Sequence, residues 1–173
     1  LELKNLTVES LIKKLTENPA FIDEFLDELT VNVTEMFRDP GFWRVMRDEI
    51  IPGILLNHKQ FKIWHAGCSS GEEVLSMAIL LREMGIHEDV TLYATDLDTN
   101  ILEKAKSASY TIKNMELNEK NYIRLEGKGS LKDYYKEENG KAVFDKSLLK
   151  NVTFRKHDLV VGELFNKFDL ILC

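Results

Sequence analysis

The feature that most constrains the fold is an alternation of short apolar runs and helical patterns within residues 61–173. The four apolar runs have the length of strands and read FKIWHAG, VTLYATD, NVTFRKHDL and FDLILC, at 61–67, 90–96, 151–159 and 168–173. Helical patterns at 71–84 and 99–108 follow the first two runs. Strands that alternate with helices are typical of a parallel sheet with right-handed crossovers. We therefore predict an α/β fold with a doubly wound sheet.

Residues 109–150 interrupt this alternation. Within them, NEKNYIRLE at 118–126 has a helical pattern, and KDYYKEENGKAVFDK at 132–146 reads as a hairpin. The dipeptide Asn139-Gly140 is a strong signal for a two-residue hairpin turn. We predict that this segment is a small antiparallel β subdomain inserted into the sheet domain.

The first 60 residues have a helical rhythm. Two sets of apolar residues share one helical face each, namely Val8, Leu11, Ile12 and Leu15, and then Ile22, Phe25, Leu26 and Leu29. Asn18-Pro19 between them is predicted to be an N-cap followed by Pro at the first helical position. Asp39-Pro40 is predicted to open a further helix, with a kink at Pro52. Gly85 is predicted to end the helix at 71–84, and Asn100 with Glu103 has the spacing of a capping box.

Composition excludes several classes of function. The net charge of −6 and the pI near 5.3 argue against a nucleic-acid partner, which would require clustered Lys and Arg. No apolar run approaches the ~20 residues of a membrane span, and no signal peptide is visible. Cys68 and Cys173 form no CxxC pair and have no His at metal-ligand spacing. We expect a reduced, cytoplasmic, metal-free protein without membrane insertion.

The two ends of the sequence suggest a fragment. The chain starts at Leu1 rather than Met and stops at Cys173, inside an apolar run. A buried strand at that position requires a helix after it to cover the sheet. We therefore expect the chain to be truncated.

A ligand site is predicted at the carboxyl ends of the first two strands. Doubly wound sheets bind ligands at this edge, near the point where the strand order reverses. The first strand ends at Ala66-Gly67, in a small-residue loop that lets a ligand approach the backbone. Asp96 ends the second strand about 25 residues after Gly71, which suits a contact to a ribose diol. The alternative is that both glycines only permit tight packing and that Asp96 caps the next turn.

Glu72 and Glu73 narrow the choice of ligand. The loop AGCSSGEE lacks the GxGxxG pattern, and a pyrophosphate would meet two carboxylates there. A nucleoside that carries positive charge instead of phosphate would be favoured, and S-adenosylmethionine is such a molecule. The alternative is that both acids only complement the dipole at a helix N-terminus.

Four segments resemble the chemotaxis receptor methyltransferases of the CheR family in order and spacing. They are NVTEMFRD, AGCSSGEE, ATDLDTNILEKAKSASY and FDLILC, at 32–39, 66–73, 94–110 and 168–173. The resemblance implies a Rossmann-like methyltransferase fold that binds S-adenosylmethionine. It further implies three parts: a remnant of an N-terminal helical domain at 1–30, a linker and first helix at 31–60, and a cofactor-binding domain at 61–173.

The resemblance also implies an activity. CheR proteins transfer a methyl group from S-adenosylmethionine to glutamate side chains of bacterial chemoreceptors, leaving S-adenosylhomocysteine and a methyl ester. The implied partner is the cytoplasmic domain of a methyl-accepting chemoreceptor, and we expect the enzyme to be a monomer. The alternatives are a CheR-like module that binds without turnover, a methyltransferase of another protein, and a different nucleotide enzyme such as a dehydrogenase.

Site residues follow from the resemblance position by position. The implied cofactor-binding residues are Asn32, Thr34, Arg38, Ala66, Gly67, Glu72, Glu73, Asp96, Asp158 and Leu159. Glu73, with Glu72 beside it, would hold the amino-acid end, Asp96 the ribose, and Asp158-Leu159 would lie at the adenine.

Arg38 is the implied catalytic residue, because its planar fork can orient a carboxylate. The alternative for Arg38 is a surface ion pair with Glu35 or Asp39. His65 is expected to be a packed or edge histidine rather than a catalyst. His157, beside Asp158, is expected to face solvent, and the alternative is a place near the adenine.

The chain departs from the family pattern at three places. Asp158 stands where the family often has Asn, and Val74-Leu75 stands where it often has Pro-Tyr. In the family, Cys173 would be followed by an Arg-Asn segment with a Tyr that lines the methyl-transfer site. The resemblance therefore implies that a catalytic Tyr lies outside this sequence.

Overall fold

The computed structural model describes residues 7–18, 21, 25 and 34–173, which form parts of two units, Leu1–Val33 and Thr34–Cys173. In the first unit, helix α1 spans Val8–Glu17, and the Thr7 side chain caps it by accepting a hydrogen bond from Ser10 N at 3.3 Å. Asn18 is the C-cap of this helix. Pro19 and the predicted face of Ile22, Leu26 and Leu29 lie outside the described residues.

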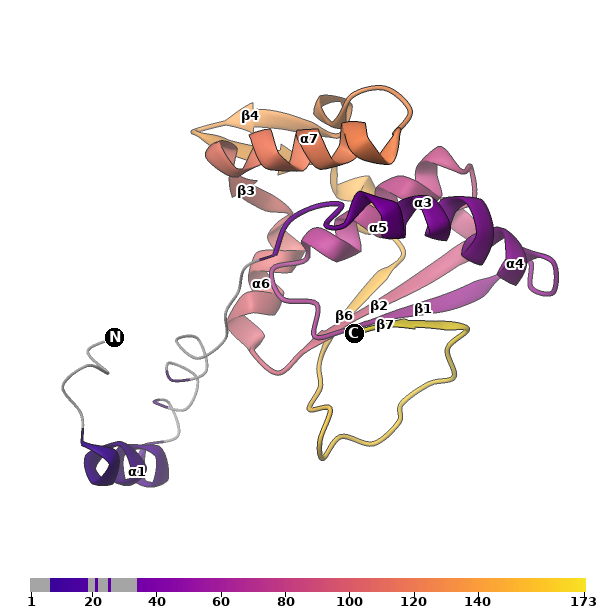
Figure 1. Cartoon of the computed structure of the whole chain (residues 1–173). Helices are drawn as coiled ribbons and strands as arrows, with labels where there is room; N and C mark the ends of the chain where they lie inside the picture. Colours follow the sequence, from indigo (N-terminus) through magenta and orange to yellow (C-terminus); the bar gives the residue numbers. More distant parts are fainter. Residues whose placement is uncertain (1–6, 19–20, 22–24, 26–33) are drawn as a thin grey trace. The chain divides into compact units, whose positions relative to one another are not determined.

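The second unit contains a sheet of four parallel strands in the order β6-β2-β1-β7 (Figure 1). The strands span Phe61–Ala66 (β1), Val90–Asp96 (β2), Val152–Lys156 (β6) and Leu170–Leu172 (β7). This confirms the predicted α/β fold, although β6 and β7 are shorter than their apolar runs. The chain moves from β1 outward to β2 and β6 and then returns to the other side of β1. The strand order therefore reverses between β1 and β7, which is where such sheets bind ligands.

Helices α5 (Glu72–Glu83) and α6 (Thr99–Ser107) follow β1 and β2, with a 3-10 turn, η3 (His87–Asp89), before β2. Gly85 ends α5 as predicted, because its φ of +76° allows a Schellman turn. In this turn, Ile86 N donates to Leu81 O at 3.0 Å, and Gly85 N donates to Arg82 O at 3.0 Å. The predicted capping box at α6 is wrong. The cap is Asp98, which has extended backbone and accepts from Asn100 N at 2.7 Å, so Asn100 lies inside the helix.

Residues 40–55 form one helical run in three parts, α3 (Pro40–Val45), a π-helical segment η2 (Met46–Ile50) and α4 (Ile51–Leu55). The predicted start at Asp39-Pro40 is confirmed. The wider π turn lies directly before Pro52, which lacks the N–H that a regular helix would use at that position. The irregularity expected at Pro52 thus takes the form of a π segment.

A second, antiparallel sheet has the order β3-β5-β4. Its strands are β3 (Ser109–Thr111), β4 (Tyr135–Glu138) and β5 (Lys141–Phe144), and helix α7 (Met115–Leu125) lies between β3 and β4 in the chain. Glu138 pairs with Lys141, which confirms the predicted two-residue turn at Asn139-Gly140. Three 3-10 segments complete this region: η4 (Ile112–Asn114), η5 (Leu131–Tyr134) and η6 (Lys146–Leu149).

One hydrophobic cluster joins both sheets and helices α3, α5 and α7. Helix α5 is buried around most of its circumference, which fixes the position of its first turn. The loop between β6 and β7 passes on the other side of the sheet from α5 (Figure 1). There, Trp64 of β1 packs against Phe165 and stacks on Phe168 of this loop, at ring-centroid distances of 5.4 and 5.1 Å.

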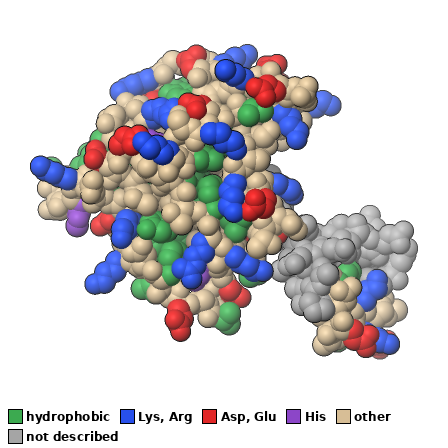
Figure 2. Space-filling view, turned by 180° about the vertical axis from the view of Figure 1, so that it is seen from behind, with side chains coloured by type: hydrophobic (Ala, Val, Ile, Leu, Met, Phe, Trp, Pro, Cys, Tyr) green, Lys and Arg blue, Asp and Glu red, His purple; other side chains and the backbone are tan. Residues whose placement is uncertain are grey.

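The surface carries charges of both signs. On the face shown in Figure 2, Lys and Arg side chains are interspersed with Asp and Glu. Within the described part of the chain, no helix is both long and apolar enough to cross a membrane.

Candidate nucleoside site at the sheet edge

A tight loop leaves β1 at the carboxyl edge of the sheet. Gly67 N and Cys68 N both donate to Thr95 O, at 2.9 and 2.8 Å, so the loop is attached to the end of β2. Gly67 and Gly71 have φ values of +75° and +88°, in the left-handed region that favours glycine.

The two glycines differ in their surroundings. A Cβ at Gly71 would lie 2.8 Å from Ala105 Cβ, so Gly71 permits α6 to pack closely, as the alternative interpretation holds. A Cβ at Gly67 would meet nothing within 4 Å, so packing does not explain that glycine. The open space beside Gly67 suits a ligand that approaches the backbone.

Asp96 ends β2 and is only half-buried. Its Oδ2 accepts a hydrogen bond from Ser69 N at 2.8 Å, and its Oδ1 accepts one from Asp98 N at 3.1 Å. The capping role that the sequence left open is therefore present. Each carboxylate oxygen can accept a second hydrogen bond, so the same side chain can still bind a pair of hydroxyls.

Glu72 is the first residue of α5, and the fold buries it. Its Oε2 accepts from Ser70 Oγ at 2.7 Å, and burial raises the pKa of its carboxyl group. The neighbouring Tyr110 donates to Ser70 O at 2.8 Å, and its pKa is raised by burial and by the charge of Glu72. Glu72 thus anchors the loop from inside the fold.

Glu73 lies in a different environment, with 42% of its side chain exposed. Its Oε1 is 2.7 Å from Nδ1 of His65, which is fully buried on β1. His65 is packed, as expected, but its pairing with Glu73 was missed. The available signal was the position of His65 near the end of β1, opposite the start of α5.

The segment before α3 carries Arg38 on a strained backbone, because Phe37 and Asp39 have φ values of +52° and +53°. The Arg38 side chain is exposed, and among the described residues it pairs with neither Glu35 nor Asp39. The surface ion pair considered for Arg38 is therefore wrong. Its carbonyl accepts from Trp43 Nε1 at 2.9 Å, which fixes the backbone rather than the guanidinium.

Three buried polar side chains hold the residues just before Arg38. Phe37 N donates to Ser76 Oγ at 2.9 Å, Met36 N donates to Asn118 Oδ1 at 3.0 Å, and Asn121 Nδ2 donates to Met36 O at 3.1 Å. Sequence reasoning missed all three, since their partners are 39 to 85 residues away. Thr34 is half-buried, and Asn32 lies outside the described residues.

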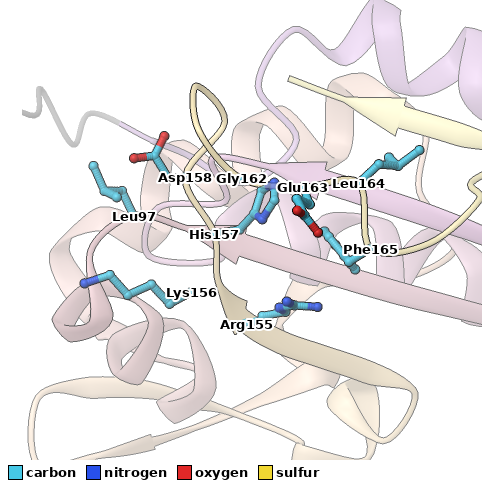
Figure 3. Close-up of a pocket in the computed structure, with 9 residues that line it drawn as sticks. All are labelled: Leu97, Arg155, Lys156, His157, Asp158, Gly162, Glu163, Leu164 and Phe165. Atoms are coloured by element: carbon cyan, nitrogen blue, oxygen red, sulfur yellow. The ribbon is translucent and has the colours of Figure 1, made fainter.

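A cavity of about 330 Å³ opens between the end of β6 and the loop that follows it, and Leu97, the residue after Asp96, is part of its lining (Figure 3). Its lining residues are Leu97, Arg155, Lys156, His157, Asp158, Gly162, Glu163, Leu164 and Phe165. Asp158 reaches this cavity, and its Oδ1 accepts from Val160 N at 2.8 Å. Leu159 is half-exposed and does not line the cavity.

His157 does not simply face solvent, as the sequence suggested. It is half-buried and packs edge-on against Trp64 and Phe165, at ring-centroid distances of 5.5 and 5.1 Å. The loop after β6 folds back over the sheet and encloses the imidazole, a contact that no local pattern reveals.

Cys68 lies in the loop but is poorly suited to be a nucleophile. Burial and the negative charge of Asp96 raise the pKa of its thiol to about 12, so the reactive thiolate is scarce. Among the described residues, no group of three His, Cys, Asp or Glu side chains is placed to hold a metal ion.

The strand order, the bend at Gly67 and the acid that ends β2 define a Rossmann-like domain of the class found in S-adenosylmethionine-dependent methyltransferases. A family model described as "CheR methyltransferase, SAM binding domain" matches residues 32–173, and the chain belongs to this family.

Named relatives agree with this assignment. The chain is 40% identical over 168 residues to "Putative methyltransferase Cher3" of Pseudomonas putida, covering 97% of this chain and 61% of the relative. It is 33% identical over 174 residues to "Chemotaxis protein methyltransferase" of Listeria innocua, covering 98% and 62%. It is 29% identical over 159 residues to "Chemotaxis protein methyltransferase 1" of Vibrio cholerae, covering 86% and 54%. The chain thus spans about three fifths of the length of its first relatives.

Proposed function

We propose that this chain binds S-adenosylmethionine at the carboxyl edge of β1 and β2. We propose further that the full protein methylates glutamate carboxylates in the cytoplasmic domain of a chemoreceptor. The observation that carries the proposal is the pair of accessible carboxylates, Glu73 and Asp96, beside the open backbone at Gly67. Two negative charges at this edge favour a nucleoside that bears a cation and disfavour one that bears a pyrophosphate.

The residues present fit this cofactor in chemistry. Asp96 would accept hydrogen bonds from the ribose hydroxyls, and Glu73 would pair with the ammonium group. The adenine would occupy the cavity lined by Leu97 and Asp158, where Asp158 can accept but, when ionised, cannot donate a hydrogen bond. Asn32, Thr34, Ala66 and Leu159 remain predicted contacts, and Glu72 would contribute by anchoring the loop that follows β1. When bound, the cofactor supplies an electrophilic methyl group on a sulfonium.

The protein's own task in this reaction is positioning. A glutamate carboxylate titrates near ~4.3 and is ionised at neutral pH, so no general base is required. The attacking oxygen must be held in line with the methyl group, and water must be excluded. Arg38 can orient a carboxylate through its guanidinium, because its side chain is exposed and its backbone is fixed.

A label-transfer assay tests the proposal. The full protein is incubated with methyl-labelled S-adenosylmethionine and a chemoreceptor cytoplasmic fragment, and the labelled product is treated with mild base. We expect incorporation that mild base removes, since methyl esters hydrolyse and N-methyl groups do not. We expect Arg38→Ala to lower the rate of methyl transfer about 100-fold. Arg38→Lys should have a rate between those of the wild type and Arg38→Ala, because lysine keeps the positive charge but lacks the planar guanidinium.

Two outcomes contradict the proposal. Base-stable label would assign the protein to another methyltransferase reaction. Cofactor binding without any incorporation would indicate a signalling module that lacks turnover. We place the reaction in the cytoplasm, where the receptor domains lie, and propose a monomeric enzyme.

A further inference from the structure

His65 is a buried polar residue to which the proposed function assigns no role. It is 0% exposed and lies on β1, one residue before the last residue of the strand. Its Nδ1 lies 2.7 Å from Glu73 Oε1. Its Nε2 is buried and has no hydrogen-bond partner among the described residues. The imidazole therefore makes one hydrogen bond, and that bond goes to Glu73.

The direction of this hydrogen bond follows from the chemistry of the two groups. An ionised carboxylate only accepts hydrogen bonds, so the hydrogen lies on Nδ1 of His65. Nδ1–H donates to Oε1, and the second oxygen of Glu73, Oε2, remains available.

Packing alone does not account for a histidine at this position. The neighbouring inward residue on β1 is Ile63, which is also 0% exposed. A buried polar group costs free energy unless it is hydrogen-bonded, and half of this imidazole's polar atoms lack a partner. An aliphatic side chain would therefore suit the core better. The hydrogen bond to Glu73 is what distinguishes histidine there.

We propose that His65 is a positioning residue for the cofactor's amino-acid end. This inference rests on the proposed function, because it specifies how Glu73 is prepared to receive an ammonium group. Glu73 stands in the first turn of α5, and nearly half of its side chain is exposed. A free glutamate at such a site samples several rotamers, and binding would have to order it. His65 holds one carboxylate oxygen, so the other faces the ligand in a fixed place.

The test compares two ligands that differ only in the part Glu73 would contact. S-adenosylhomocysteine carries the amino-acid end, and 5′-methylthioadenosine has the same nucleoside and a thioether without that end. Dissociation constants for both are measured by calorimetry on the full protein, as wild type, His65→Leu and His65→Asn. The leucine removes the donor at similar volume, and the asparagine places an amide N–H where Nδ1 lies.

We expect His65→Leu to lower the affinity for S-adenosylhomocysteine about 5- to 10-fold, and to change the affinity for 5′-methylthioadenosine by less than about twofold. We expect His65→Asn to recover most of the lost affinity. If His65 served only in packing, His65→Leu would lower the affinity for both ligands alike, and His65→Asn would not restore it. Either equal losses for the two ligands or no loss for S-adenosylhomocysteine would overturn the inference.

A replacement variant and the wild-type binding data separate the possible outcomes. If His65→Leu does not fold, His65→Gln replaces it, because its longer side chain places the amide near the former Nε2, away from Glu73. If the wild-type protein does not bind S-adenosylhomocysteine, the proposed function fails and this inference fails with it. Binding by the wild type together with an unchanged ligand preference in the variants would refute only the role of His65.

Discussion

At the residue scale, Glu72 and Glu73 are adjacent in the sequence and have different surroundings in the fold. Glu72 is buried against Ser70, whereas Glu73 is exposed and paired with His65. Successive helical residues point about 100° apart, so the two side chains at the start of α5 meet different surroundings. Sequence reasoning could predict that the acids serve different ends. It could not assign them, because the inward face of α5 depends on the sheet beneath it.

Glu72 leads to a prediction about stability and pH. Burial raises the pKa of its carboxyl group in the folded state, so the folded protein holds this proton more tightly than the unfolded chain does. The stability that this group contributes is complete below the unfolded pKa, near ~4.3, and is lost as pH rises through the raised folded value. Glu72→Gln has no proton to lose and can still accept from Ser70. We therefore expect the melting temperature of Glu72→Gln to rise relative to that of the wild type as the pH increases from the unfolded pKa of Glu72 through its raised folded pKa.

Thermal unfolding of the wild type and Glu72→Gln, from about pH 4 to about pH 8, measures how the difference between their melting temperatures depends on pH. Glu116→Gln is a matched control, because Glu116 is an exposed glutamate whose pKa is lowered by its hydrogen bond to Lys120. For this control, the melting temperature of the variant should fall relative to that of the wild type as pH rises. Parallel curves for the wild type and Glu72→Gln would show that burial of this carboxyl group has no energetic consequence.

At the element scale, helix α7 connects the antiparallel sheet to the Arg38 segment. Asn118 and Asn121 are each 3% exposed, and both bind the backbone of Met36. Their hydrogen bonds help to offset the strain of the left-handed residues Phe37 and Asp39 that flank Arg38. The inserted region thus supports the proposed reaction centre from a distance.

We predict that Asn118→Leu destabilises this support. The substitution leaves the Met36 N–H buried without its acceptor, which costs about 1–3 kcal/mol of unfolding free energy. Urea denaturation measures the loss, and hydrogen exchange should speed up at Met36 and Phe37 more than in α5. Asn100→Ala, at an exposed position of α6, is the control and should change stability by less than about 0.5 kcal/mol. Unchanged exchange at Met36 in Asn118→Leu would contradict the role assigned to this contact.

Local signals predicted some elements and failed at others for a physical reason. The turn at Asn139-Gly140, the end of α5 at Gly85 and the start of α3 at Pro40 each depend on the backbone preferences of one or two residues. The cap of α6 depends on where β2 stops and the backbone turns, which placed Asp98 rather than Asn100 at the N-cap. Tertiary context therefore decides among several residues that could cap a helix.

At the scale of the whole molecule, the alternation of strands and helices predicted the parallel sheet and its binding edge. The pairing of β7 with β1, which creates the reversal of strand order, joins residues more than 100 apart and leaves no local trace. The same holds for the loop after β6, which folds back over Trp64. Asp96 and Gly67 could be predicted as site residues because strand ends and glycine bends are local. His65, Ser76, Asn118 and Asn121 were missed because their roles exist only in the folded chain.

The central claim is that the acids at this edge select a nucleoside with a cation over one with a pyrophosphate. Calorimetry on the full protein, with S-adenosylhomocysteine and NAD as alternative ligands, tests it most directly. We expect the wild type to bind S-adenosylhomocysteine and to show no measurable binding of NAD. We expect Glu73→Gln and Asp96→Asn each to lose at least about tenfold in affinity for S-adenosylhomocysteine. Tight binding of NAD, or affinity for S-adenosylhomocysteine that is unchanged in both variants, would contradict it.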